Sequence, residues 1–425
     1  MVLSKNLYSG IVVILGLVQL IESLAFSIPL SYFPNYAISL GASVASIGLF
    51  TSSFMIAASI MSPKLGGLSD VHGRKKIMLI GLLGDVILGA LTGLVPSWQW
   101  LLLIRVLNGI FSSAAMLPAQ VLLIDSVSEF HRGEASGFVM SLSMIGRNIG
   151  PLFGGAIQWF GEMKGLNLVD SYRIPYFVDA ALALIAVLLV AWKVQEPEKH
   201  NAVQRLRSKD NIEKTHMSFS FKILLISGVA NGIAMGFIIP IMALFYTDKF
   251  GIQPVQIGFI LSITGFVGLG ASWLAGRLSD RFGRKPLIAL GGILSRAFGI
   301  ILPLTEDINQ AAGVQAVRSL SFNINMPSMR ALLADLAPKE SLGKTIGYFM
   351  TAFTSGSIIG PILGTWLYSK FRYETFNVGG INIPGLGIPF FVNATIGLAT
   401  TFMLLLFVKV PKKTSIDQLE VKVHR

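Results

Sequence analysis

The 425-residue chain contains no cysteine and few charged residues, which make up only 13% of it. Without cysteine it can have no disulfide framework, no thiol nucleophile and no cysteine metal site. Its five histidines all fall in polar stretches between or beyond the apolar segments. The sequence also lacks the HExxH and GxSxG patterns of common hydrolases. These absences argue against an enzyme, and we expect neither a cofactor nor a bound metal ion.

Hydrophobic residues, by contrast, are abundant. They form 53% of the chain and its mean hydropathy is +0.67, a balance typical of a protein whose solvent is lipid. Apolar runs of about 20 residues, the length that a helix needs to cross the hydrocarbon core, recur along the whole sequence. Because lipid cannot hydrogen-bond the backbone, and strand-like alternation is absent, we expect an all-α membrane protein. The twelve predicted spans cover residues 8–35, 44–64, 77–96, 99–125, 134–160, 174–194, 219–246, 253–275, 286–305, 308–336, 344–369 and 385–410.

The formal net charge of +12 could suggest a nucleic-acid partner, but its distribution argues against one. An even number of spans places both termini on the same side of the membrane. If that side is the cytoplasm, the basic stretches at 74–76, 193–214 and 277–285 all face inward. The only basic residues in the predicted outer loops are Lys164, Arg173, Lys249, Lys370 and Arg372. This asymmetry follows the positive-inside rule, so we expect a plasma-membrane protein with both termini in the cytoplasm.

The sequence consists of two similar halves. A polar interval at 195–218 separates six predicted spans from the next six, and we interpret it as a cytoplasmic linker. Asp280 lies 210 residues after Asp70, and Asp335 lies 210 residues after Asp125. One offset at separate landmarks indicates an internal repeat, an arrangement typical of secondary transporters with a site between the halves. We therefore predict six-helix bundles at 1–194 and 219–410 and a cytoplasmic tail at 411–425.

A charged pattern, G-x-L-S-D-x-x-G-R-K, occurs once in each half, at 66–75 and 276–285. Each aspartate can pair with the arginine that follows it across a turn that the intervening glycine permits. One copy alone would fit a solvated turn equally well, but two copies at the shared offset favour a cytoplasmic gate. The predicted gating loops contain Gly66, Asp70, Gly73, Arg74, Gly276, Asp280, Gly283 and Arg284.

The fifth predicted span carries glycines at four-residue spacing. Gly146, Gly150 and Gly154 lie on one helix face, which lets another helix approach closely. Pro151 removes a backbone hydrogen bond and bends the span there. The complete string consists of Gly137, Gly146, Gly150, Pro151, Gly154 and Gly155. Span eleven repeats all of it but the last glycine, from Gly347 to Gly364, again 210 residues further on.

These motifs resemble those of a known family. The two charged loops resemble the signature cytoplasmic motif of the major facilitator superfamily, and the glycine string resembles the antiporter motif of its twelve-span drug:proton antiporters. LLLIRVLNG at 101–109 is similar to the family's fourth-span motif, except that Asn108 stands where Gln is usual. The resemblance implies two pseudo-symmetric six-helix bundles that rock about a central cavity and exchange an extruded solute for protons. It also implies a role in proton coupling for Arg105, whose counterpart in the second half is Gln315.

Ionisable residues inside the spans are informative because each costs about 2.5–3.5 kcal/mol at a span centre on insertion scales. Glu22 lies in the middle of the first span, on a face with Gln19 and Phe26. Apolar surroundings disfavour the charged form of a carboxylate, so such a group can take up and release a proton near neutral pH. We therefore predict a proton-coupling site at Glu22, together with Arg105, for which the resemblance implies such a role. In the alternative interpretation, Glu22 is a permanent ion-pair partner of Arg105 or Arg147.

In the second half, Arg318 shares a helical face with polar and apolar residues that suit a cavity wall. The predicted substrate cavity consists of Gln19, Phe26, Asn108, Arg147, Asn231, Gln315, Arg318, Phe322 and Asn325. Asp85 and Arg296 lie in spans that the resemblance makes peripheral, where a local ion pair or hydrogen bond is the simpler interpretation. Arginines outnumber the carboxylates Glu22 and Asp85 inside the spans, a balance that suits an anionic or zwitterionic solute.

The sequence thus predicts a secondary active transporter rather than a membrane enzyme, and a receptor or scaffold would not need a duplicated core with buried charges. The glycine string favours a proton-coupled antiporter, and we expect a monomer that exports a small amphipathic or drug-like solute by alternating access. The alternative is a proton-coupled symporter that takes up a small organic metabolite, anionic metabolites included.

The orientation can be tested directly because the chain has no cysteine of its own. Cysteines introduced singly at 195–218 or 411–425 should react with an impermeant maleimide only from the cytoplasmic side. A cysteine at Lys164 should react only from outside and serves as the control. Labelling of the linker or the tail from outside would contradict the orientation inferred from loop charge.

Overall fold

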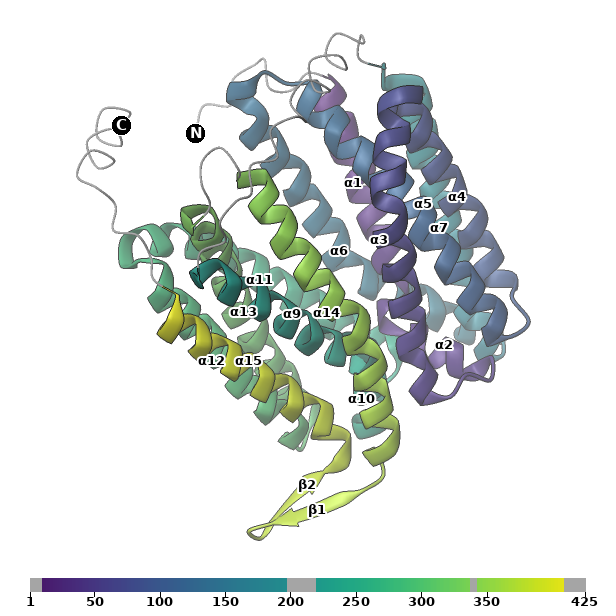
Figure 1. The fold of residues 1–425 in the computed structure, drawn as a ribbon. Helices are drawn as coiled ribbons and strands as arrows, with labels where there is room; N and C mark the ends of the chain where they lie inside the picture. Colours follow the sequence, from purple (N-terminus) through teal and green to yellow (C-terminus); the bar gives the residue numbers. More distant parts are fainter. Residues whose placement is uncertain (1–9, 197–218, 337–341, 409–425) are drawn as a thin grey trace, which may run out of the picture.

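The computed structural model describes residues 10–196, 219–336 and 342–408. Residues 197–218 of the predicted linker and the predicted tail lie outside these ranges. Within them, twelve helices are 18 residues or longer (Figure 1): α1 (Gly10–Ser27), α3 (Ile47–His72), α4 (Arg74–Leu94), α5 (Trp98–Asp125), α6 (Arg132–Met163), α7 (Leu168–Lys193), α9 (Phe219–Ile238), α11 (Pro254–Phe282), α12 (Arg284–Ile301), α13 (Ile308–Leu336), α14 (Leu342–Phe371) and α15 (Ile388–Phe407).

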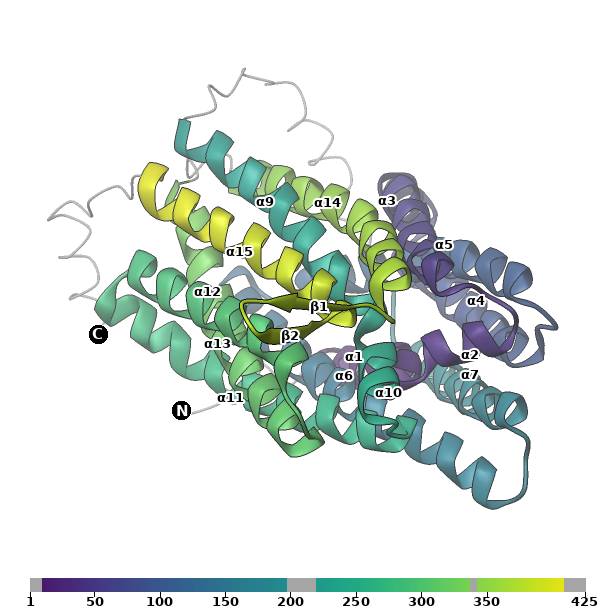
Figure 2. The same cartoon turned by 90° about the horizontal axis from the view of Figure 1, so that it is seen from below.

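Each predicted span corresponds to one of these long helices. Ten of the helical segments are long and apolar enough to cross a membrane. The two long helices outside that set are α6 and α13. Polar residues such as Arg147 and Arg318 interrupt their apolar sequence. Seen from the end that carries the strands, the helices of the first half (from purple) and those of the second half (teal to yellow) form two groups (Figure 2). The twelve-helix, two-bundle prediction is confirmed.

The first and seventh predicted spans are not continuous helices. The 3-10 turn η1 (Ile28–Ser31) follows α1 and leads to the short helix α2 (Phe33–Ser39). Likewise, η5 (Ile239–Ile241) follows α9 and leads to α10 (Met242–Phe250). Each turn contains a proline, Pro29 or Pro240, which lacks the N–H needed to continue an α-helix. The sequence prediction treated these segments as uninterrupted.

A β-hairpin, which the sequence did not predict, follows α14. Strands β1 (Thr375–Val378) and β2 (Ile381–Pro384) pair antiparallel, and they project beyond the ends of α14 and α15 (Figure 1). Gly379 and Gly380 form the turn with φ of +61° and +85°, a conformation that favours glycine. We call this the hairpin end of the molecule, and the end that carries Gly73 and Gly283 the charged end.

The charged motifs are helical rather than loops, which corrects the sequence interpretation. Helix α3 continues to His72 and α4 begins at Arg74, so the break is a single glycine with φ of +97°. The second copy breaks in the same way at Gly283, with φ of +90°, between α11 and α12. Because the break is so short, the charged side chains are fixed by two helix ends.

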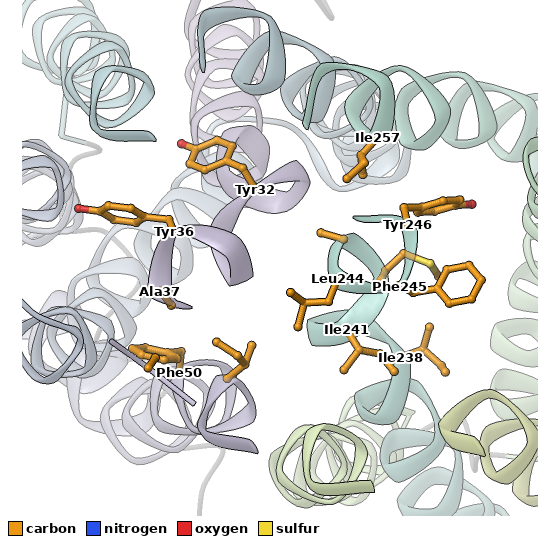
Figure 3. Packing of buried hydrophobic residues seen from close by; sticks show 14 of the residues in the cluster. Tyr32, Tyr36, Ala37, Phe50, Ile238, Ile241, Leu244, Phe245, Tyr246 and Ile257 are labelled. Atoms are coloured by element: carbon orange, nitrogen blue, oxygen red, sulfur yellow. The ribbon is translucent and has the colours of Figure 1, made fainter. Parts of the chain in front are cut away.

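In the part of the chain that the structure describes, the apolar core joins the two halves at the hairpin end. One buried cluster there contains residues of both halves, among them Tyr36, Phe50, Ile241 and Phe245 (Figure 3). Toward the charged end, one buried cluster contains only first-half residues and another only second-half residues. Among the described residues, the halves are thus held together at one end and keep separate cores at the other.

Glycines bring helices into backbone contact within each half. A Cβ at Gly150 would lie 2.6 Å from the Leu24 carbonyl oxygen of α1, and Gly146 and Gly154 also contact the α1–η1 backbone. In the second half, Gly356, Gly360 and Gly364 face the α9 backbone in the same way. Gly155 instead contacts Pro254 of α11, while a Cβ at Gly137 would meet nothing within 4 Å. The four-residue spacing therefore marks the α1–α6 and α9–α14 contacts.

This difference provides a matched pair of substitutions. Gly150→Leu should force α1 and α6 apart, destabilise the protein by about 1–3 kcal/mol and reduce transport severely, because a close-packed site cannot accept extra methylenes. Gly137→Leu, on the same helix with free space around it, should leave both unchanged. Thermal unfolding in detergent and transport in vesicles measure the two effects. If Gly150→Leu matched Gly137→Leu in both thermal stability and transport, with both at the wild-type level, the α1–α6 contact would be unimportant.

Candidate functional site

A cavity of about 400 Å³ lies within the first half, a volume in the range of small-molecule sites. Side chains from α1, α3, α4, α5, α6 and α7 line it, and every lining residue lies between Leu15 and Ala183. The wall is mostly apolar, with a few polar groups among the aliphatic and aromatic side chains. Six residues predicted from the sequence line it: Gln19, Glu22, Phe26, Arg105, Asn108 and Arg147.

The second-half residues predicted for the same cavity do not line it. Asn325 Nδ2 donates to the Ile288 carbonyl of α12 at 3.1 Å, so its amide is used in helix packing. The Oδ1 atom of Asn231 accepts a hydrogen bond from Arg296, and Gln315 accepts one from Arg318. Phe322 is half-buried in α13. The predicted residues thus divide between the first-half cavity and a separate region of the second half.

Three carboxylates line the first-half cavity: Glu22 of α1, Asp85 of α4 and Asp179 of α7. All three lie within electrostatic range of one another. The interpretation of Asp85 as a peripheral residue with a local partner is wrong, since it faces the cavity and has neither an ion pair nor a hydrogen bond to any described residue. Asp179 was missed, although it lies inside the predicted span 174–194, and the rule that selected Glu22 would have found it.

Glu22 lacks a full set of hydrogen-bond partners among the described residues. Its Oε1 atom is buried and has no hydrogen-bond partner among the described residues. At the next residue of α1, the hydroxyl groups of Ser23 and Ser143 lie 2.6 Å apart and join α1 to α6, and Gln19 Nε2 donates to Ser23 Oγ at 3.3 Å. The backbone that carries Glu22 is therefore well fixed, while its carboxylate remains available.

Arg105 is held by an aromatic ring rather than by Glu22. Its guanidinium lies over the Phe33 ring, 4.2 Å from the centroid, a cation–π geometry. Its Nε is buried without a hydrogen-bond partner, and the carboxylate whose charge it influences is Asp179. Within the described ranges no ion pair joins Glu22 to Arg105 or to Arg147. The structure therefore gives no support to the alternative in which Glu22 is a permanent ion-pair partner.

Asp179 is positioned by a close approach of α4 to α7. A Cβ at Gly89 would lie 3.2 Å from Asp179 Oδ2 and 3.4 Å from the Cα of Ala180. Glycine at this position therefore leaves room for the carboxylate at the cavity wall.

With three carboxylates and only Arg105 and Arg147 as cations, the cavity contains an excess of acidic groups. Each further ionised carboxylate repels the others, so binding of a proton or a cation relieves the repulsion.

A second set of charges lies at the charged end of the first half. Arg74 forms an ion pair with Asp125 and lies 3.7 Å from Asp70, whose side chain is 58% exposed. Glu196 accepts hydrogen bonds from the backbone N–H groups of Arg74, at 2.6 Å, and Lys75, at 2.7 Å. A carboxylate at this helix N-terminus satisfies free N–H groups and the helix dipole. The sequence predicted the Asp70–Arg74 pair but missed Glu196.

The second half repeats part of this arrangement. Arg284 Nε lies 3.3 Å from Asp335 Oδ2, and its Nη1 donates to Ser279 Oγ at 3.1 Å. Asp335 corresponds to Asp125 by the 210-residue offset. The Asp280 side chain lies outside what the structure describes, so its predicted pairing with Arg284 stays a prediction. The shared Arg–Asp contact joins equivalent helices in both halves.

Curated relatives of similar length match most of the chain. Multidrug resistance protein 2 of Bacillus subtilis is 26% identical over 366 residues, which covers 84% of this chain and 88% of that protein. The multi-drug resistance efflux pump PmrA of Streptococcus pneumoniae is 25% identical over 359 residues and covers 82% and 87%.

A solved structure shares the fold. The bacterial homolog of the human lysosomal transporter Spinster, in an inward-facing and occupied conformation, superposes with a TM-score of 0.78. The alignment covers 96% of this chain and 98% of that one, at 17% sequence identity. The family model described as Major Facilitator Superfamily matches residues 15–222 and 224–423. This match and the two-bundle fold show that the chain is a multi-pass membrane transporter that belongs to the Major Facilitator Superfamily.

Proposed function

We propose that the chain is a proton-coupled antiporter that exports a small amphipathic or drug-like solute. The observation that carries this proposal is a set of three carboxylates, Glu22, Asp85 and Asp179, which line one cavity and form no ion pair with any described residue. Buried ionisable groups in membrane helices are expensive and are typical of proton pathways. The relatives named above as multidrug resistance proteins support export of drug-like compounds.

Coupling needs a group whose protonation differs between the two states of the transport cycle. Glu22 fits this role because it lies on α1, which packs against α6 through the glycine contacts and so moves with the first half. In our proposal, a proton neutralises the Glu22 carboxylate when the cavity is empty, and binding of the solute displaces that proton. Arg105, which acts on Asp179, adjusts the charge balance of the same cavity.

The contact pattern supports a specific state. The shared apolar core lies at the hairpin end, and the charged end has separate cores. With the termini and the charged motifs in the cytoplasm, as loop charge indicates, this is an inward-facing arrangement of one monomer. The Arg74–Asp125 and Arg284–Asp335 pairs then brace each half at the cytoplasmic side, where the two halves have separate apolar cores.

The proposal makes Glu22 essential for coupling but not for binding. Glu22→Gln should abolish accumulation of solute driven by a pH gradient, because a neutral amide cannot cycle a proton. Downhill exchange should stay within about twofold of wild type, since the cavity shape is retained. The measurement is solute flux in inverted vesicles with and without an imposed pH gradient, and its sign distinguishes export from uptake.

Two further variants make this result interpretable. Glu134→Gln removes an exposed carboxylate of α6 outside the cavity and should behave as wild type. Asp179→Asn tests whether coupling depends on the whole carboxylate group, in which case it should be impaired as well. If Glu22→Gln still concentrates solute against a gradient by using protons, Glu22 is not the coupling residue. Proton-driven uptake by the wild type would favour the symporter instead.

A further inference from the structure

Two arginines lie inside the second half, on neighbouring helices. Arg296 of α12 is only 9% exposed, and Arg318 of α13 is half-buried. A Cβ at Gly299, one turn after Arg296, would lie 3.6 Å from Arg318 Nε. The Arg318 guanidinium therefore reaches α12 close to Arg296, and each charge lies within range of the other. Two like charges in this setting repel each other and lose hydration.

Among the described residues, the hydrogen-bond partners of these arginines are all neutral groups. Arg296 Nη1 donates to Asn393 Oδ1 at 3.2 Å and Nη2 donates to Asn231 Oδ1 at 3.1 Å. Arg318 Nη1 donates to Gln315 Oε1 at 3.2 Å. Neither forms an ion pair with any described residue. The acidic residues of the described second half occur at helix ends and in connections: Asp248, Asp280, Glu306, Asp307, Asp335 and Glu374.

The charged positions inside the helices are not shared between the two repeats. At the 210-residue offset, Glu22, Asp85 and Asp179 correspond to Gly232, Ser295 and Pro389, none of which is charged. Arg296 and Arg318 in turn correspond to Val86 and Asn108. The two halves have thus acquired opposite buried charge on one shared fold.

A buried hydroxyl next to this pair also lacks a partner. Tyr246 of α10 is fully buried, and its hydroxyl has no hydrogen bond to any described residue. Its counterpart by the offset, Tyr36, donates to the Thr92 carbonyl at 2.8 Å. Figure 3 shows the Tyr246 hydroxyl directed away from the interface between the halves, toward the helices of the second half. It lies there within electrostatic range of Arg318.

We propose that Arg318, Arg296 and Tyr246 form an anion site that binds the carboxylate or phosphate group of the transported solute. Guanidinium N–H groups and a phenol O–H are donors suited to an oxyanion, and guanidinium groups bind carboxylate and phosphate in a bidentate manner. The bound anion neutralises the arginine pair and accepts from the unpaired Tyr246 hydroxyl. This inference goes beyond the proposed function, since it concerns binding and holds whether or not protons drive transport.

The site can be tested with four probes that share one aromatic ring but differ in charge. Benzoate and phenyl phosphate should raise the Tm of the purified protein in neutral detergent, by mass action on the folded state. Benzyltrimethylammonium and benzyl alcohol should raise it much less at equal concentration. Titration of the Tm shift gives a dissociation constant for each probe without any pH gradient, so the result is independent of proton coupling.

Variants of Arg318 assign the binding. Arg318→Gln should weaken benzoate and phenyl phosphate binding at least tenfold, and Arg318→Lys should restore part of it. Tyr246→Phe should weaken it to a smaller degree, while Arg330→Gln, an exposed arginine of the same helix, should leave it unchanged. We choose Arg318 rather than Arg296 for substitution, because the two amide contacts of Arg296 also join α12 to α9 and α15.

Two results would overturn the proposal. One is a wild-type protein that the aromatic anions stabilise no more than the cationic and neutral probes. The other is an Arg318→Gln protein that binds both anions as wild type does. Stabilisation by phosphatidylglycerol without any response to the aromatic anions would assign the arginines to a lipid headgroup, and the solute assignment would then be wrong.

Discussion

The high cost of an uncompensated charge in an apolar medium governs this structure. At the charged end, arginines meet aspartates, and Arg74 and Arg284 are each paired in this way. Inside the helices the opposite holds, because among the described residues one Glu22 carboxylate oxygen has no partner and Arg318 has only an amide partner. Charges that the protein does not neutralise itself are available to a ligand. This distinction separates structural charges from those that we assign to binding.

Close helix packing turns these local charges into a property of a whole half. Gly150 and Gly360 place the α6 and α14 backbones against α1 and α9, so the helices that carry Glu22 and Asn231 are tightly connected to their neighbours. At the hairpin end, Gly48 contacts the Pro361 backbone across the interface. Two rigid halves joined at one end are what rigid-body alternating access requires. The chemistry of each half can then be exposed to either side of the membrane without unfolding.

Most of the fold could be predicted from sequence because apolar runs and the 210-residue repeat depend on local composition. The proline turn at η1 and the hairpin after α14 were missed, since neither changes the hydropathy of its surroundings. The site was predicted in part. Glu22 followed from the rarity of charge in membrane helices, and Asp179 was available to the same rule, whereas the role of Arg105 was implied by the family resemblance of the fourth span. The separation of the predicted cavity residues between the two halves depends on helix rotation, which the sequence pattern does not define.

The most direct test is proton movement caused by solute. Purified protein is reconstituted into liposomes that contain a pH-sensitive dye, a pH gradient is imposed, and cationic, neutral and anionic drug-like compounds are added in turn. Proton-coupled antiport predicts that a transported compound dissipates the gradient in protein-containing liposomes, at a rate that rises with its concentration and is absent from empty liposomes. Solute transport with no solute-dependent proton flux would contradict the proposed coupling.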